Sequence, residues 1–121
     1  GSVPMRLDRE RLQDILEAIQ KIEQYAQEGK IRFEQDELIQ TWTLYHLQII
    51  GEAAGRLSDE IRNRNKDIPW PQIISLRNII VHNYFGIDLE EIWATVERDV
   101  PVLLEQIKTI ERDIDSFESE Q

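Results

Sequence analysis

Residues 77–84 (RNIIVHNY) gather the side chains that phosphate chemistry uses. The planar guanidinium of Arg77 matches the oxygens of a phosphate group. Histidine exchanges protons near neutral pH, which makes His82 a candidate acid or base, and the Asn78 amide can orient a neighbour or donate to a phosphate oxygen. Together these residue types suit RNA transesterification, in which a 2′-hydroxyl attacks the adjacent phosphate and the protein stabilises the added charge.

Helical geometry restricts how these residues can act together. At about 100° per residue, Asn78 and His82 share one face of a helix, whereas Arg77 and His82 lie roughly 140° apart. They converge if the arginine wraps around the helix, if the helix is distorted near His82, or if a second copy of the chain contributes. A two-fold dimer would bring two histidines into one cleft, one as base and the other as acid.

Each of these residues also has a structural interpretation. A histidine in the last turn of a helix can interact with the helix dipole, and Arg77 can pair with an acid such as Glu52. Tyr84 and Phe85 can pack at the turn that Gly86 permits. The second histidine, His46, is expected to be a hydrogen-bonded structural residue.

Residues 77–84 are expected to be positioned by helices, because apolar residues recur at steps of three and four through most of the chain. The expected helical faces cover residues 12–22, 38–54, 73–81 and 93–114. Gly29 is a stop signal for the first helix, and the third is expected to begin at Trp70 or Pro71. Ser58 or Asp59 would cap a short helical piece, and Asp88 would cap the fourth helix.

The pattern predicts an all-α fold, an up-and-down bundle of four main helices. Pro101 lies inside the fourth apolar stripe and is expected to kink or split it, which would make a fifth piece after Pro101. No alternation typical of strands and no internal repeat is present.

The net charge of −10 argues against binding of nucleic acid by bulk electrostatics. The charge is uneven, however, since the segment 56–66 holds four basic residues: Arg56, Arg62, Arg64 and Lys66. They are candidate contacts for an RNA backbone, and the alternative is a solvated helix end and loop.

One domain is expected over residues 5–115, with residues 1–4 as an expression-tag remnant and 116–121 as a frayed acidic tail. The chain has no cysteine, which suits a reducing cytosol, and no apolar run long enough to span a membrane or open a signal peptide. We therefore expect a cytoplasmic protein with no membrane partner. No glycine-rich phosphate loop, nucleophile elbow or paired-histidine zinc motif is present, so no cofactor and no metal are predicted.

The spacing of Arg77, His82 and Tyr84 resembles the signature of HEPN ribonuclease toxins of the HepT type. The resemblance extends to residues 50–54 (IGEAA), 68–70 (IPW), 84–88 (YFGID) and 92–93 (IW), and it covers nearly the whole chain from Met5 to about Ile110.

This resemblance implies a homodimer that cleaves RNA without a metal in a cleft at its interface. Arg77 and His82 would be catalytic, and Asn78 would support them. The toxin's partner would be a minimal nucleotidyltransferase antitoxin that silences it by attaching AMP to Tyr84. Two alternatives stay open: a non-catalytic dimer that serves as a binding module for the nucleotidyltransferase, and a purely structural helical dimer.

Overall fold

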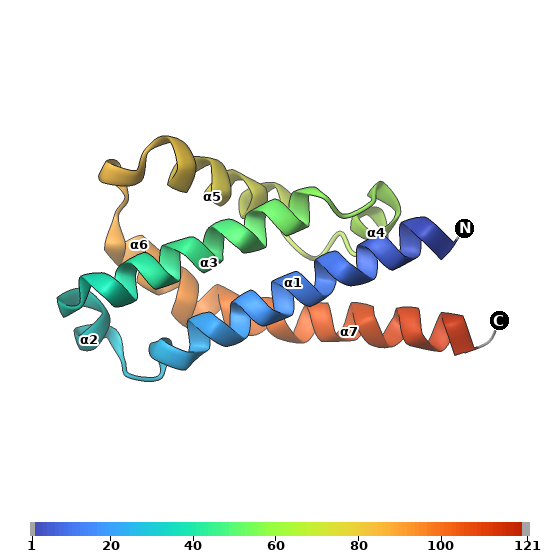
Figure 1. Ribbon diagram of the computed structural model, residues 1–121, viewed down its shortest axis with the longest axis horizontal. Coiled ribbons are helices and arrows are strands. Elements are labelled where there is room, and N and C mark those ends of the chain that lie inside the picture. The colour runs from blue at the N-terminus through green and yellow to red at the C-terminus, as the bar shows by residue number, and fades with distance from the viewer. Residues whose placement is uncertain (1, 120–121) are drawn as a thin grey trace.

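Four long helical stretches run alternately up and down in the computed structural model, which describes residues 2–119 (Figure 1). The elements in chain order are α1 (Ser2–Ala26), α2 (Lys30–Gln35), α3 (Glu37–Gly55), α4 (Asp59–Arg64), α5 (Trp70–His82), the 3₁₀ turn η1 (Tyr84–Gly86), α6 (Leu89–Ala94), the π-helical turn η2 (Thr95–Asp99) and α7 (Val100–Ser119). Residues 2–119 contain no strand. The predicted all-α up-and-down bundle is confirmed.

Helix α3 is the centre of the bundle, with α1 packed on one side of it and α5 on the other (Figure 1). Helix α7 packs against α1. An apolar groove of about 750 Å³ separates α5 from α7, with Leu76 and Ile79 on one wall and Val100 and Leu103 on the other. Helix α5 therefore depends on α3 for most of its support.

The core contains most of the apolar residues that the helical periodicity predicts, but Leu38 and Tyr45 of α3 and Val81 of α5 are exposed instead. On α1 the stripe from Leu12 to Ile22 is buried, and four of its five predicted members have no exposed surface: Leu12, Ile15, Ile19 and Ile22. The last helical stretch buries Val96, Val100, Leu103, Ile107, Ile110 and Ile114 along one side. Burial of these side chains supplies most of the driving force that assembles the bundle.

Side-chain caps begin three of the helices. Ser58 caps α4 by accepting a hydrogen bond from the Ile61 N–H, and Asp88 caps α6, as predicted. Asp36 caps α3, and neither this cap nor the short helix α2 was predicted. Gly29 lies between α1 and α2 with φ of 94°, a left-handed conformation that favours glycine.

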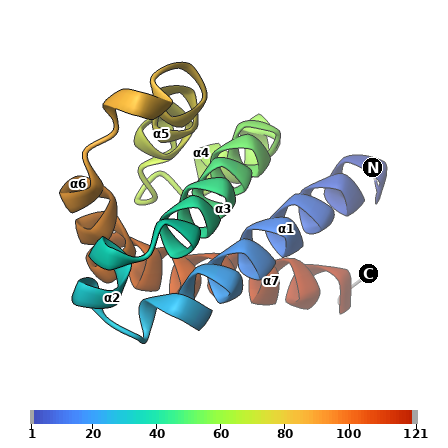
Figure 2. The ribbon, with the colours of Figure 1, turned by 60° about the vertical axis from the view of Figure 1, so that its left-hand side comes forward.

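Pro101 affects the last helix through the π-helical turn that precedes it. In η2 the Val100 N–H donates to the Thr95 carbonyl, five residues back, and α7 starts at Val100. Proline lacks an N–H and crowds the carbonyl four residues earlier, so a widened turn at this place relieves the conflict. The expected fifth piece is therefore α7, and Figure 2 shows it changing direction relative to α6 without a break in the chain.

The ends of the chain bear on two further predictions. The backbone of residues 2–4 belongs to α1, and α7 extends to Ser119, so residues 116–119 are helical. Gly1 and residues 120–121 lie outside the described residues, and the tag remnant and the frayed tail stay predictions. None of the described helices combines the length and the apolar character that crossing a membrane requires.

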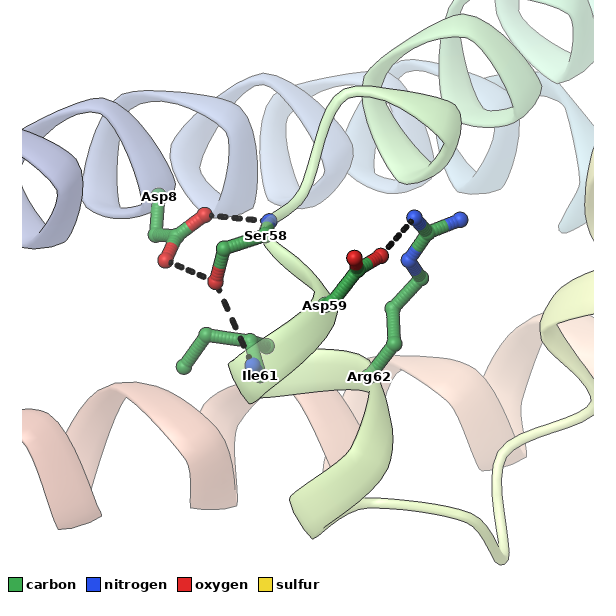
Figure 3. A network of polar contacts seen from close by, with 5 residues as sticks. All are labelled: Asp8, Ser58, Asp59, Ile61 and Arg62. Atoms are coloured by element: carbon green, nitrogen blue, oxygen red, sulfur yellow. Dashed lines mark hydrogen bonds and ion pairs between the residues drawn. The ribbon is translucent and has the colours of Figure 1, made fainter.

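A buried carboxylate fastens α1 to α4 (Figure 3). The side chain of Asp8 is 5% exposed. It accepts hydrogen bonds from the Ser58 N–H at 2.8 Å and from the Ser58 hydroxyl at 2.6 Å. Since the Ser58 oxygen in turn caps α4 through the Ile61 N–H at 3.2 Å, one network joins the start of the chain to the connection that leads into α5.

We expect Asp8→Ala to lower the free energy of unfolding by about 2 kcal/mol, because two donors of Ser58 lose a charged acceptor. Chemical denaturation measures the change. Asp59→Ala is the matched control: its carboxylate is 89% exposed and pairs only with Arg62 at 2.9 Å among the described residues, so the loss should stay within about 0.5 kcal/mol. Equal losses in the two variants would contradict the role given to Asp8.

Candidate active site at the end of helix α5

The four residues singled out in the sequence lie along the second half of α5 and the turn that follows it. Arg77 and Asn78 are on α5, His82 is its last residue, and Tyr84 opens η1. The helix starts at Trp70 as predicted, with Pro71 in the first turn, where the missing N–H costs nothing. It ends regularly, since the Asn83 N–H still donates to the Ile79 carbonyl at 2.9 Å.

The guanidinium of Arg77 is held by two neighbours. Its Nε and Nη2 donate to one oxygen of Glu52 on α3 at 3.4 and 3.3 Å, and its Nη1 donates to the Asn78 side-chain oxygen at 3.1 Å. The Arg77 and Glu52 side chains keep 33% and 39% of their surface exposed. Glu52 is therefore the ion-pair partner of Arg77 that the structural interpretation expected. The arginine also remains accessible from solvent.

A glycine sets the distance between α3 and α5 at this point. A Cβ atom added to Gly51 would lie 2.4 Å from the Cβ of Arg77 and 3.0 Å from the Ile73 carbonyl oxygen. Only a residue without a side chain allows this approach. The close contact brings the backbone of Arg77 against α3, one residue from Glu52.

His82 and Tyr84 are exposed, and within residues 2–119 neither side chain has a hydrogen-bond partner. Tyr84 is 44% exposed, and its ring meets that of Phe85 edge-on at 5.6 Å between centroids. The expected packing of this aromatic pair against the turn is wrong for Phe85, which is completely exposed. The free end of α5 therefore presents an imidazole and two aromatic rings to solvent.

Asn83 shapes the turn beside the candidate site, and sequence reasoning missed this role. A Cβ added to Gly86 would lie 2.7 Å from the amide nitrogen and oxygen of the Asn83 side chain, so this side chain folds directly over the glycine. The Gly86 N–H also donates to the Asn83 carbonyl at 3.0 Å. The signal available in the sequence was the pairing of an asparagine with a glycine three residues later, which is typical of a tight turn.

Within one chain, the structure does not direct Arg77 and His82 toward a common point. The hydrogen-bonding pattern of α5 is undistorted up to His82, and Glu52 and Asn78 hold the arginine on the side of α3. Two of the three routes to convergence are thus not observed. The third route, a second copy of the chain, is the one that this geometry leaves open.

The basic residues of segment 56–66 lie near the opposite end of α5. Helix α4 and the start of α5 are at the end of the bundle where α1 begins (Figure 1). His82 is the last residue of α5, and at the rise of a helix it lies about 20 Å along that helix from its start. Arg62 pairs with Asp59 at 2.9 Å and Arg64 with Glu60 at 3.7 Å. The four residues Arg56, Arg62, Arg64 and Lys66 therefore do not join the candidate site of their own chain.

His46 has the structural role predicted for it. It is 5% exposed, its Nδ1 lies 2.7 Å from the Trp42 carbonyl oxygen, and its ring packs on that of Trp42 at 4.5 Å. Across the part of the chain that the structure describes, no three histidine, aspartate or glutamate side chains gather in a way that could hold a metal ion.

We expect Gly51→Ala to lower the free energy of unfolding by about 1–3 kcal/mol, because the new methyl group forces α5 away from α3. Gly55→Ala on the same helix is the matched control. Its nearest neighbour would be an Ile74 carbon at 3.9 Å, so this change should be neutral or stabilise by up to about 1 kcal/mol. Thermal and urea unfolding measure both, and equal stabilities would refute the close contact.

The chain is similar to known ribonuclease families and proteins. A family model described as "Ribonuclease HepT-like" matches residues 15–110. A protein of Thermococcus cleftensis named "Probable ribonuclease HepT" is 36% identical over 101 residues, which cover 81% of this chain and 90% of that protein. A "Putative RNase" of Methanocaldococcus jannaschii is 32% identical over 114 residues, 93% of this chain and 94% of that protein.

A longer relative from Methanocaldococcus jannaschii is named "Gamma-glutamylcyclotransferase and putative RNase". It is 35% identical over 105 residues, 86% of this chain, and the chain spans only 47% of its length. No solved structure matches the chain. The family match covers α3 and α5 in full, parts of α1 and α7, and the whole run from Arg77 to Tyr84, so the chain belongs to the HepT-like ribonuclease family, as its motifs predicted.

Proposed function

We propose that this protein is the ribonuclease toxin of a bacterial toxin–antitoxin pair, which cleaves cellular RNA in the cytoplasm at a site formed between two copies of the chain. The observation that carries the proposal is the exposed His82 at the end of α5, five residues from a partly exposed Arg77, in a member of the HepT-like family. Its relatives are named as ribonucleases, which supports the same activity here.

The proposed reaction needs a base, an acid and a cation. One His82 accepts the proton of the 2′-hydroxyl, whose oxygen attacks the adjacent phosphorus. The bond from phosphorus to the 5′-oxygen breaks, and a second histidine gives that oxygen its proton. The products are a cyclic phosphate and a free 5′-hydroxyl. Arg77 stabilises the charge on the phosphate oxygens, with Asn78 holding its guanidinium at 3.1 Å.

A second copy of the chain can bring together Arg77 and His82, which point to different places within one chain. A two-fold axis near the end of α5 would place two His82 side chains in one cleft and let the arginine of one chain serve the histidine of the other. Two apolar side chains beside the candidate residues support association at this place, since Ile79 is 48% and Val81 40% exposed. Apolar groups gathered at the surface commonly mark an interface.

We expect Arg77→Ala and His82→Ala each to abolish RNA cleavage, and a mixed dimer of one wild-type and one His82→Ala chain to lose it as well. The shared cleft of such a dimer holds a single His82, so either the base or the acid is missing. Co-expression with two different affinity tags isolates the mixed dimers, and cleavage of total cellular RNA is the measurement.

Three results would contradict parts of this proposal. Cleavage by folded His82→Ala at the wild-type rate would remove His82 from the mechanism. Mixed dimers of wild-type and His82→Ala chains that keep about half of the wild-type activity would show that the two histidines do not share one cleft. Wild-type protein that binds a nucleotidyltransferase tightly and cleaves no RNA would instead indicate the non-catalytic binding module.

Tyr84 is the proposed point of control by a minimal nucleotidyltransferase antitoxin. Its side chain is 44% exposed, and its hydroxyl has no partner within residues 2–119, so an enzyme can reach it. It stands two residues from His82. An adenylate attached there adds bulk and negative charge where an RNA phosphate must enter, and both block the substrate.

We expect the partner nucleotidyltransferase with ATP to add adenylate to the wild type and to Tyr45→Phe, and not to Tyr84→Phe. Tyr45 is a matched control, since it is also exposed, at 59%, and lies on α3. Intact-mass measurement reads the added adenylates, and the RNA cleavage assay should lose activity in parallel. Equal addition to Tyr84→Phe would remove the regulatory role.

The basic residues of segment 56–66 have a place in this proposal as contacts for a longer RNA. An RNA that continues along α5 from His82 would reach α4 after about 20 Å. Because Arg62 and Arg64 are already paired with acids, the contribution of this segment to affinity is expected to be small.

A further inference from the structure

Phe85 is an apolar ring that the fold holds completely in solvent. Its relative exposure is 101%, against 44% for the neighbouring Tyr84. A phenylalanine normally stabilises a protein by burial, and here it contributes nothing of that kind. We propose that Phe85 is a stacking platform for one base of single-stranded RNA beside the scissile phosphate. This inference rests on the ribonuclease function proposed above.

The turn that carries Phe85 is well defined, so the backbone from which the ring projects is held in place. Backbone hydrogen bonds flank it on both sides, from the Gly86 N–H to the Asn83 carbonyl at 3.0 Å and from the Ile87 N–H to the Tyr84 carbonyl at 3.4 Å. The Asn83 side chain lies against Gly86. A binding residue held in advance loses less conformational entropy when its ligand arrives.

The faces of the ring are open to a ligand. Tyr84 meets Phe85 nearly at a right angle, with an interplanar angle of 85° and centroids 5.6 Å apart. This arrangement supports the ring edge-on and leaves a face uncovered, as the full exposure requires. Every base has a flat π surface, so such a face accepts bases without strict choice of sequence.

The ring is within reach of the proposed chemistry. Phe85 follows His82 by three residues, so their Cα atoms are at most about 11 Å apart. Asn83 lies between them on the same turn and adds hydrogen-bonding groups. A base next to the phosphate under attack can therefore meet the ring while His82 acts on the ribose.

The charge of the protein favours stacking as the source of RNA affinity. The chain carries a net charge of −10, so overall electrostatics oppose binding of a polyanion. Stacking does not depend on charge. It requires an unpaired base that can unstack from the adjacent bases, which identifies the ligand as single-stranded RNA.

We expect Phe85→Ala and Phe85→Leu to raise the KM for single-stranded RNA about tenfold with little change in kcat. Phe85→Trp, which keeps an aromatic face, should retain a KM near wild type. The leucine variant separates ring stacking from simple apolar contact. Because Phe85 is completely exposed, these variants should keep the wild-type melting temperature, which serves as the folding control.

A binding measurement that needs no catalysis separates this inference from the proposed activity. The probe is a ten-nucleotide single-stranded RNA that carries the fluorescent base 2-aminopurine. Binding to the His82→Ala protein should quench the fluorescence of this base. The double variant with Phe85→Ala should quench it less. Salt should weaken this binding only slightly. Quenching that depends on Phe85 with no cleavage by the wild type would overturn the ribonuclease proposal and keep the platform. The stacking platform would be overturned if Phe85→Ala left both the KM and the fluorescence quenching unchanged. It would also be overturned if sedimentation showed that Phe85→Ala dissociates the dimer, because Phe85 would then be an interface residue.

Discussion

The close approach of α3 and α5 at Gly51 is the constraint on which the candidate site depends. Because Gly51 has no side chain, the backbone of Arg77 lies directly against α3, and the Ile73 carbonyl lies beside it. Glu52 follows on the same helix and meets the guanidinium. The depth at which α5 rests on α3 therefore also determines which way the arginine points.

This single contact matters because α5 is supported on one side only. It packs on α3, while the groove of about 750 Å³ separates it from α7. Only Trp70 and Ile80 of α5 are buried. One consequence is that the end of the helix projects from the bundle, with His82 and the η1 turn exposed. An extended RNA and a modifying enzyme both need access of this kind, which a site inside the bundle would not offer.

The elements of the fold that depend on local sequence were predictable. Apolar periodicity predicts the buried stripes of α1 and α7, and Ser58 and Asp88 cap the helices for which they were proposed. The family followed from motifs spread along the chain. Features that depend on contacts between helices were not predictable, because periodicity describes one helix at a time. The close approach of α3 and α5 at Gly51 and the position of α4 at the far end of α5 from η1 are of this kind.

The interpretation of Arg77 as a partner of Glu52 and its interpretation as a phosphate ligand are compatible. The ion pair is long, at 3.3 Å, and both side chains keep about a third of their surface exposed. Exposed pairs of this type contribute about 0–1 kcal/mol, whereas paired hydrogen bonds from arginine to a phosphate are stronger and more directional. A phosphate can therefore displace the carboxylate at small cost. In the proposed reaction, Glu52 and Asn78 would limit the orientations of the guanidinium beforehand, so binding of the RNA phosphate would cost less entropy.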